Sequence, residues 1–241
     1  VSRGTARDRG RRGGTNEIVN CADTEPTRFI DSDSDEVADF VKQVLADAGV
    51  DRNDQRAVAV ALFGAVRDGI RYDPYALSTS ADGYRASAIT RSKSNWCVPK
   101  AILYTAALRH VGIPARLAFA DVRNHLTSKK LSASMGTDVF AWHGYTEVYL
   151  DGHWLKASTA FNIELCERFG VKVLDFDGVH DALMHPFDEA GNRHMEYVRQ
   201  RGSFDDLPLE EIFATFAEIY PAPSTAAADA TDQHPDQDFA P

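Results

Sequence analysis

Apolar residues recur at helical spacing in two segments near the start of the chain. In the first they are Val37, Phe40, Val41, Val44, Leu45 and Ala48, followed by Gly49. The second covers residues 57–66 and stops near Gly69. Apolar residues three or four positions apart share one helix face, so both segments are predicted to be amphipathic helices. Asp33, with Glu36 three residues later, is the predicted cap of a first helix over residues 35–48.

A third helical segment is apolar on every side. Residues 101–111 are mostly Ala, Ile, Leu, Tyr and Val, and Gly112 and Pro114 follow them. A helix without a polar face needs neighbours all around it. This segment is therefore predicted to be a buried central helix. A final helix is predicted near residues 208–219, where apolar residues again recur at helical spacing.

Between these helices the apolar pattern becomes alternating, which predicts strands at residues 115–122, 141–150 and 153–160. Asp151-Gly152 separates the last two and favours a type I′ hairpin. A two-residue turn fixes the register, so Glu147 should face Lys156 as a charge pair. By the same count Tyr145 should face Ser158, which puts Ser158 on the same side of the sheet as His143.

Composition and charge favour one globular domain with two tails. The chain has 241 residues, 44% of them hydrophobic and 26% charged, as in ordinary globular proteins. Residues 1–14 hold five arginines against one aspartate, and residues 222–241 hold four aspartates and no Lys or Arg. Both segments lack apolar residues that could form a core, so they are predicted to be disordered. Residues 15–221 are the predicted domain.

The charge balance also bears on partners and location. A net charge of −10 disfavours nucleic acids and anionic membranes, because both attract positive charge. No apolar run is long enough for a membrane helix or a signal peptide, so the cytoplasm is the expected location. The sequence leaves the oligomeric state open.

Three cysteines, Cys21, Cys97 and Cys166, are too few for a disulfide framework, and no C-x-x-C pair suggests a thiolate zinc site. Several loop histidines match no zinc spacing either, and no metal or cofactor is predicted. Cys21 is expected to be an exposed thiol and Cys166 a core residue.

Cys97 differs from the other two because it stands where the buried helix should begin. Pro99 suits a first helical turn, and Ser94 or Asn95 could cap the helix. The positive end of the helix dipole is then expected to lower the pKa of the thiol and make Cys97 a nucleophile. The alternative is a small buried residue without chemistry. The nearby basic residues Lys100 and Arg116 are expected to be solvated.

His143 is the best candidate for a base that would act on Cys97. It lies early in a predicted strand, next to Gly144, where another backbone could approach closely. The order of elements is a helix that begins with cysteine, a strand, and then a hairpin that carries histidine and a second polar residue. This is the topology of a site with cysteine, histidine and a third, orienting residue.

Three segments resemble motifs of the transglutaminase-like superfamily. Residues 96–103 with the downstream Gly-Ile-Pro-Ala-Arg at 112–116 resemble its cysteine motif, residues 143–154 resemble its histidine motif, and residues 70–72 resemble its lead-in strand. The resemblance covers roughly residues 55–162. It implies a papain-like α+β fold in which a central helix with an N-terminal cysteine packs on an antiparallel sheet. It also implies that Cys97 attacks a carboxamide or other acyl carbon and that His143 shuttles the proton.

The sequence departs from the family pattern at the third residue. The pattern resembles W-x-x-x-D-P, and from Trp154 onward it places Ser158 where the family has Asp. A hydroxyl can accept the proton of His143 Nδ1, but it has no charge to stabilise an imidazolium. Asn162 is an alternative orienting residue if the strand continues. An oxyanion hole would need the Cys97 N–H and one more donor, for which Trp96 and Tyr72 are candidates.

Two functions remain open from the sequence. The first is a cofactor-independent enzyme that transfers an acyl group or hydrolyses an amide, with Cys97, His143 and Ser158 as catalytic residues. The second is a catalytically weakened or inactive domain that binds a peptide or a protein partner. The missing carboxylate at position 158 motivates the second.

Overall fold

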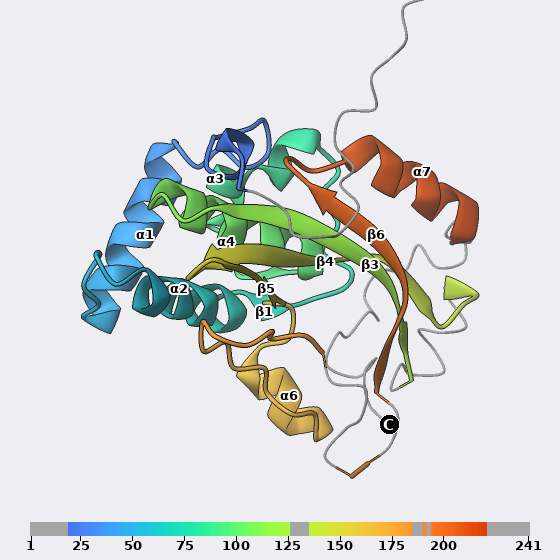
Figure 1. The fold of residues 1–241 in the computed structure, drawn as a ribbon. Helices are drawn as coiled ribbons and strands as arrows, with labels where there is room; N and C mark the ends of the chain where they lie inside the picture. The colour runs from blue at the N-terminus through green and yellow to red at the C-terminus, as the bar shows by residue number, and fades with distance from the viewer. Residues whose placement is uncertain (1–18, 126–134, 185–189, 192–193, 221–241) are drawn as a thin grey trace, which may run out of the picture.

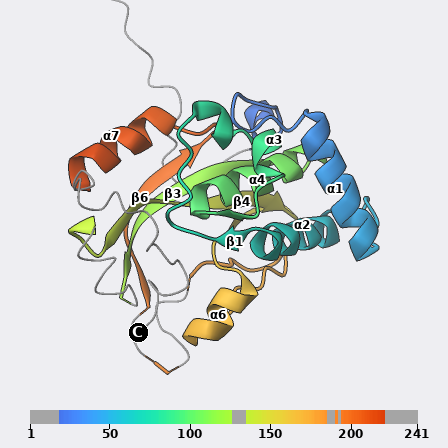
Figure 2. The same cartoon turned by 180° about the vertical axis from the view of Figure 1, so that it is seen from behind.

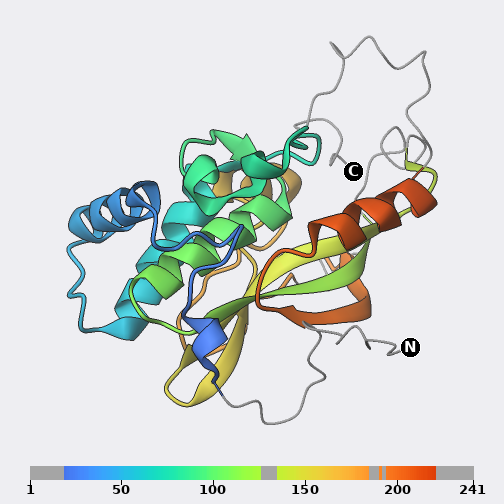
Figure 3. The same ribbon diagram turned by 90° about the horizontal axis from the view of Figure 1, so that it is seen from above.

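The computed structural model describes residues 19–125, 135–184, 190–191 and 194–220. The predicted tails, residues 1–14 and 222–241, lie outside them. In the described part, helices gather against a four-stranded antiparallel sheet (Figure 1, Figure 3). The α+β architecture expected from the sequence is confirmed. Among the described residues, no helix is long and apolar enough to cross a membrane.

The four predicted helices form, together with two short ones that the sequence did not predict. They are α1 (Asp35–Ala48), α2 (Gln55–Gly69), α3 (Ala86–Ile89), α4 (Cys97–His110), α6 (Ile163–Phe169) and α7 (Leu209–Ile219), with short 3-10 helices at Cys21–Asp23 and Ala81–Tyr84. The predicted cap of α1 is wrong by one residue. Ser34 is the last extended residue before the helix, and its hydroxyl accepts the Val37 N–H at 3.4 Å.

The sheet has the order β5-β4-β3-β6. Its strands are β3 (Ala115–Asn124), β4 (Val139–Leu150), β5 (His153–Ala157) and β6 (Met195–Phe204), and a separate parallel pair joins β1 (Arg71–Tyr72) to β2 (Ser94–Asn95). The sequence did not predict β6. This strand lies at the edge of the sheet, and several of its central residues are exposed and polar, which hides the alternating pattern.

The predicted central helix is α4, in which every residue from Cys97 to Arg109 is buried. It lies across β3 and β4, with α1 and α2 beside it (Figure 2). Gly144 of β4 allows this close packing. A Cβ atom at that position would lie 3.0 Å from Val98 Cα and 3.0 Å from Val98 Cγ2.

Lys100 and Arg116, expected in solvent, are both buried. The Lys100 Nζ donates to the carbonyls of Arg67 at 2.8 Å, Ile70 at 2.6 Å and Ala160 at 2.8 Å. Burial lowers the pKa of Lys100 to about 7. Each proton of the ammonium has an acceptor, so this one side chain ties α4 to the end of α2 and to the segment after β5.

The predicted Glu147–Lys156 charge pair does not form, although the two residues do face each other. The Glu147 carboxylate instead accepts the Arg116 Nε–H at 2.7 Å and the Ser203 hydroxyl at 2.7 Å. The Arg116 guanidinium also lies 4.0 Å above the ring of Trp154. Arg116 is buried next to Glu147, whereas Lys156 can extend into solvent, so the buried arginine takes the carboxylate.

The hairpin forms in the predicted register, with Asp151 (φ 49°) and Gly152 (φ 87°) both left-handed as a type I′ turn requires. Its ladder ends at Thr146–Ala157, so the strand predicted to reach residue 160 is too long. After the ladder ends, the Ser158 N–H donates at 2.9 Å to the carbonyl of Ala182, which belongs to a later segment of the chain. Ser158 therefore follows β5 instead of facing Tyr145 in a ladder.

Candidate active site

Cys97 is the first residue of α4, as predicted, but the helix has no side-chain cap. Trp96 is the N-cap residue. The side chain of Asn95 accepts the N–H of Trp96, at 3.2 Å, and accepts no N–H from inside the helix. The backbone N–H groups of Cys97, Val98 and Gly144 lie against the thiol. The prediction that Ser94 or Asn95 caps the helix is thus wrong, and the uncapped start of α4 lies next to the Cys97 sulfur.

The pKa of Cys97 is not depressed as predicted. Burial raises it to about 11, although the three N–H groups and the Lys100 ammonium act in the opposite direction. Burial also lowers the pKa of His143 to about 4. At a pH between these two pKa values, the Cys97 thiol and the His143 imidazole are both neutral. A proton can still move from sulfur to nitrogen inside the pair without any change in net charge.

The position of His143 follows from an irregularity in β4. The β3–β4 register shifts between Ala120 and Val122, and Trp142 adopts a left-handed backbone with φ 58°. Such a conformation is costly for a bulky residue and needs support from its surroundings. Asp121 supplies it by accepting the Trp142 N–H at 3.0 Å. Bulges next to active sites often re-aim a side chain, and this one precedes His143 directly.

Two further contacts hold Trp142 in place. Arg201 of β6 pairs with Asp121, at 3.0 Å for Nη2–Oδ2, and lies 4.4 Å from the Trp142 ring. The indole N–H of Trp142 donates at 2.9 Å to the hydroxyl of Thr215 in α7. This support could not be predicted, since nothing in the local sequence marks a tryptophan for a left-handed backbone.

Ser158 lies beside His143, with 3.4 Å between the serine Oγ and the imidazole Nε2. The prediction that serine would meet Nδ1 is wrong, since Nε2 is the nitrogen that faces it. Nδ1 is the ring nitrogen that does not contact Ser158. Asn162 does not take part, because its side-chain oxygen accepts the Tyr72 N–H at 3.1 Å as the cap residue of α6.

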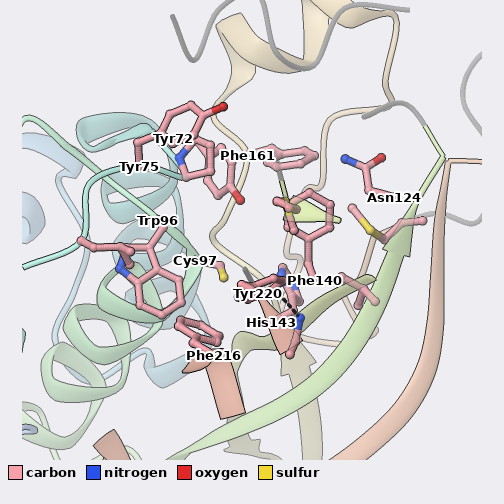
Figure 4. A pocket seen from close by; sticks show the side chains of 16 residues that line it. Tyr72, Tyr75, Trp96, Cys97, Asn124, Phe140, His143, Phe161, Phe216 and Tyr220 are labelled. Carbon is pink, nitrogen blue, oxygen red and sulfur yellow. Dashed lines mark hydrogen bonds between the residues drawn. The ribbon is translucent and has the colours of Figure 1, made fainter. Parts of the chain in front are cut away.

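Cys97 and His143 line one pocket of about 200 Å³. The thiol lies between Trp96, Tyr72 and Tyr75 on one side and His143 and Phe140 on the other (Figure 4). Phe216, at the end of α7, packs against Trp96 with 6.0 Å between ring centroids. The pocket therefore joins the start of α4, the irregular part of β4 and the end of α7.

Both predicted oxyanion donors, Trp96 and Tyr72, line the pocket. The Trp96 ring packs edge-on against Tyr84, with 6.4 Å between centroids, and its buried indole N–H makes no hydrogen bond within the described residues. The pKa of Tyr72 is raised by burial and by the nearby Cys97. The Cys97 N–H, together with the Trp96 indole or the Tyr72 phenol, is thus the candidate set of donors.

Cys21, Cys166 and the described histidines other than His143 are not among the residues that line this pocket. Cys21 is exposed and Cys166 buried, as predicted. His180 pairs with Asp177 at 2.7 Å, and His194 stacks on Phe161. No group of three or more His, Cys, Asp or Glu side chains could hold a metal ion within the part of the chain that the structure describes.

Residues 42–159 match the model of the transglutaminase-like superfamily. This segment belongs to that superfamily. The transglutaminase-like segment begins within α1, ends just after β5, and contains Cys97, His143 and Ser158. Both β6 and α7 lie outside it.

A crystal structure of a proposed cysteine protease from Cytophaga hutchinsonii is similar to this chain, with 20% sequence identity and a TM-score of 0.40. The similarity covers 57% of this chain and 40% of that one, so it spans less than half of that protein. No curated protein matches the chain at a significant level.

Replacing Gly144 by alanine should destabilise the transglutaminase-like segment. The added methyl group would meet the backbone of α4 at 3.0 Å, and overpacking of this kind costs about 1–3 kcal/mol. Urea denaturation of both proteins measures the loss. Gly64→Ala is the matched control, because Gly64 lies in α2 with open space around it. It should raise the free energy of unfolding by about 0.5–1 kcal/mol. Equal losses in the two variants would contradict the packing argument.

His143 should make the protein sensitive to acid. Its pKa falls from 6.5 to about 4 on folding, so between these values the unfolded chain binds a proton that the folded protein does not. The free energy of unfolding should then fall by about 3 kcal/mol from this residue as the pH drops from 6.5 to 4. Denaturation at pH 7 and pH 4 measures the loss, which His143→Gln should reduce. An equal loss in both proteins would assign the acid sensitivity to other groups.

Proposed function

We propose that this protein is a cysteine-dependent enzyme that acts on an amide or related acyl group, with Cys97 as the nucleophile. His143 would be the general base and then the acid, and Ser158 a neutral orienting residue. The observation that carries the proposal is that Cys97 and His143 line one pocket while Ser158 lies 3.4 Å from His143 Nε2. Membership of residues 42–159 in the transglutaminase-like superfamily supports cysteine chemistry at the level of the superfamily.

The reaction begins with a proton transfer from the Cys97 thiol to Nδ1 of His143. The thiolate then adds to the acyl carbon, and the carbonyl oxygen becomes an oxyanion near the Cys97 N–H and a second donor, Trp96 or Tyr72. When the tetrahedral adduct collapses, its C–N bond breaks and the imidazolium gives its proton to the departing amine. A thioester remains on Cys97. Water or an amine then attacks it, His143 takes the proton of the attacking group, and the sulfur leaves and recovers that proton.

Ser158 would set which nitrogen acts as the base. If its hydroxyl accepts the Nε2 proton, Nδ1 carries the lone pair that takes the proton of Cys97. A serine orients the ring as an aspartate does but adds no negative charge near the imidazolium. The ion pair should therefore form less readily than in a site with a carboxylate.

A second candidate function is a binding domain with a weakened or inactive site. The same neutral serine favours it, as does a thiol whose pKa burial raises to about 11. Such a protein would hold a peptide or partner in the pocket without turning it over.

Substitution of Ser158 separates the two candidates. In a weakened catalytic site, Ser158→Asp should raise the rate at which iodoacetamide alkylates Cys97 at neutral pH by about tenfold. A nearby negative charge that shifts the pKa of the imidazole by one unit changes the ion-pair population by that factor. Ser158→Ala, the matched control, should lower the rate. Unchanged rates in both variants would contradict the orienting role of Ser158.

Turnover tests the proposed function itself. A series of acyl p-nitroanilides is incubated with the protein, and the release of p-nitroaniline is followed with water alone and with an added primary amine. The wild-type protein should release the aniline, and Cys97→Ser and His143→Gln should not. Faster release or a new amide product with the amine would indicate transamidation. Release that persists in Cys97→Ser would contradict the proposal.

A further inference from the structure

The described residues that line the pocket at Cys97 carry no charge. Of the described residues that line it, none is Asp, Glu, Lys or Arg. Its polar side chains are Asn124, His143 and three tyrosines, and the rest are apolar or aromatic apart from the thiol. Leu77 lines the pocket and is 46% exposed, which places it at the mouth. A ligand that enters past Leu77 therefore meets mostly apolar side chains before it reaches the sulfur.

The size of the pocket limits what can fit beside the thiol. Its volume is about 200 Å³, and an apolar cavity of about 150 Å³ is known to hold benzene. One aromatic ring or one branched aliphatic chain would therefore fill it. A carboxylate or ammonium group in the same place would lose its water without gaining a charged partner, which strongly disfavours binding.

One wall of the pocket comes from α7, outside the transglutaminase-like segment. Phe216 and Tyr220 line the pocket from the end of this helix. The helix is anchored to β4 at two adjacent residues just before His143. Thr215 accepts the Trp142 indole N–H at 2.9 Å, and the Tyr220 hydroxyl accepts the Ala141 N–H at 2.8 Å. The wall is thus fixed relative to His143, and the Phe216 ring limits the depth of the pocket beside Trp96.

We infer that the group bound next to the reacting carbon is uncharged and apolar, about the size of one aromatic ring, and that Phe216 of α7 determines that size. This inference rests on the proposed role of Cys97 as a nucleophile. The substrate class is then an amide or acyl compound with an aromatic or branched aliphatic group beside the carbonyl. Acyl groups with a charge at that position would be poor substrates.

Three alkylating probes test the preference without requiring turnover. Iodoacetamide is small and neutral, N-phenyliodoacetamide adds a ring, and 4-(iodoacetamido)benzoate adds a carboxylate to that ring. In each case the thiolate displaces iodide and forms a thioether. Peptide mass spectrometry gives the rate at Cys97, divided by the rate with glutathione. N-phenyliodoacetamide should react at least tenfold faster than either of the others. Equal normalised rates, or a faster rate for the carboxylate probe, would overturn the inference.

The role of Phe216 is tested with a bulkier probe, N-naphthyliodoacetamide. Phe216→Ala should raise its normalised rate at Cys97 severalfold over wild type. Ile219→Ala is the matched control, because Ile219 is on the same helix, is 41% exposed and is not among the residues that line the pocket. It should leave the rate unchanged. Equal effects of the two substitutions would show that Phe216 does not determine the size of the group that the pocket accepts.

The outcomes separate this inference from the proposed function. If the phenyl preference holds but no acyl donor is turned over, the pocket assignment stands and the enzymatic proposal fails. If donors are turned over with no preference between apolar and charged acyl groups, the enzyme assignment stands and the substrate class is wrong.

Discussion

Replacing His143 by alanine is expected to lower the rate of Cys97 alkylation at pH 7 by a factor of about 10²–10⁴. Burial raises the pKa of the thiol to about 11, so Cys97 alone would hold very little thiolate at neutral pH. In the wild-type protein the neutral imidazole removes the thiol proton while the sulfur attacks, so the reaction does not depend on the small equilibrium fraction of thiolate. Iodoacetamide labelling, resolved at each cysteine by peptide mass spectrometry, measures the rate.

The pH dependence of Cys97 labelling distinguishes the wild-type protein from the His143 variants most clearly. The wild-type rate should rise as the pH passes the pKa of His143, about 4, and then stay level over the neutral range, because the imidazole that removes the thiol proton during the attack stays neutral there. In His143→Ala the rate should climb about tenfold for each pH unit towards 11. His143→Gln, which keeps more of the volume, should behave in the same way.

Cys166 is an internal control for these profiles. Its pKa is also raised to about 11, mainly by burial, and His143 does not appear among the groups that perturb it. Its labelling should be the same in all three proteins. Superimposable Cys97 profiles for wild type and both variants would contradict the role of His143 as a base.

Replacing Lys100 by methionine is expected to lower the free energy of unfolding by about 3–5 kcal/mol. Methionine has a similar length but no proton donor, so the carbonyls of Arg67, Ile70 and Ala160 would all lose the donor they have at 2.6–2.8 Å. Urea denaturation at pH 7 measures the loss. Lys42→Met on the exposed face of α1 is the matched control, and it should change stability by less than about 0.5 kcal/mol.

The pH dependence of this loss has a definite sign. The folded pKa of Lys100, about 7, lies below its ordinary 10.5, so between these values the unfolded chain binds a proton that the folded protein lacks. Wild-type stability gains from Lys100 as the pH rises through this window, whereas Lys100→Met has no such gain. The difference between the two proteins should therefore grow from pH 7 towards pH 10. A constant difference, or one as small as that of Lys42→Met, would contradict the role of the buried ammonium.

The elements that place the site could be predicted because their signals are local. The all-apolar run after Pro99 marks α4, and Asp151-Gly152 fixes the hairpin register from two residues. The contact between His143 and Ser158 followed from that register, even though the ladder ends one residue before Ser158. Periodicity and turn chemistry act within a few residues, so the sequence shows them directly.

The electrostatics of the site could not be predicted in this way. The helix dipole at Cys97 can be inferred from the sequence, but burial by α7 and β4 outweighs it, and burial depends on contacts between distant segments. The burial of Lys100 could not be predicted for the same reason, because its three acceptors come from the end of α2 and from the segment after β5. The left-handed backbone of Trp142 likewise depends on Asp121 in a neighbouring strand.

Intact-mass spectrometry most directly tests whether Cys97 carries the acyl group. The protein is mixed with an activated ester of an apolar acid, such as p-nitrophenyl phenylacetate, and quenched in acid within the first turnover. Wild type should gain the mass of one phenylacetyl group, and hydroxylamine, which cleaves thioesters, should remove it. Cys97→Ala should gain none. An adduct that persists in Cys97→Ala, or a wild-type protein that stays unmodified while iodoacetamide still alkylates Cys97, would contradict the assignment of Cys97 as the nucleophile.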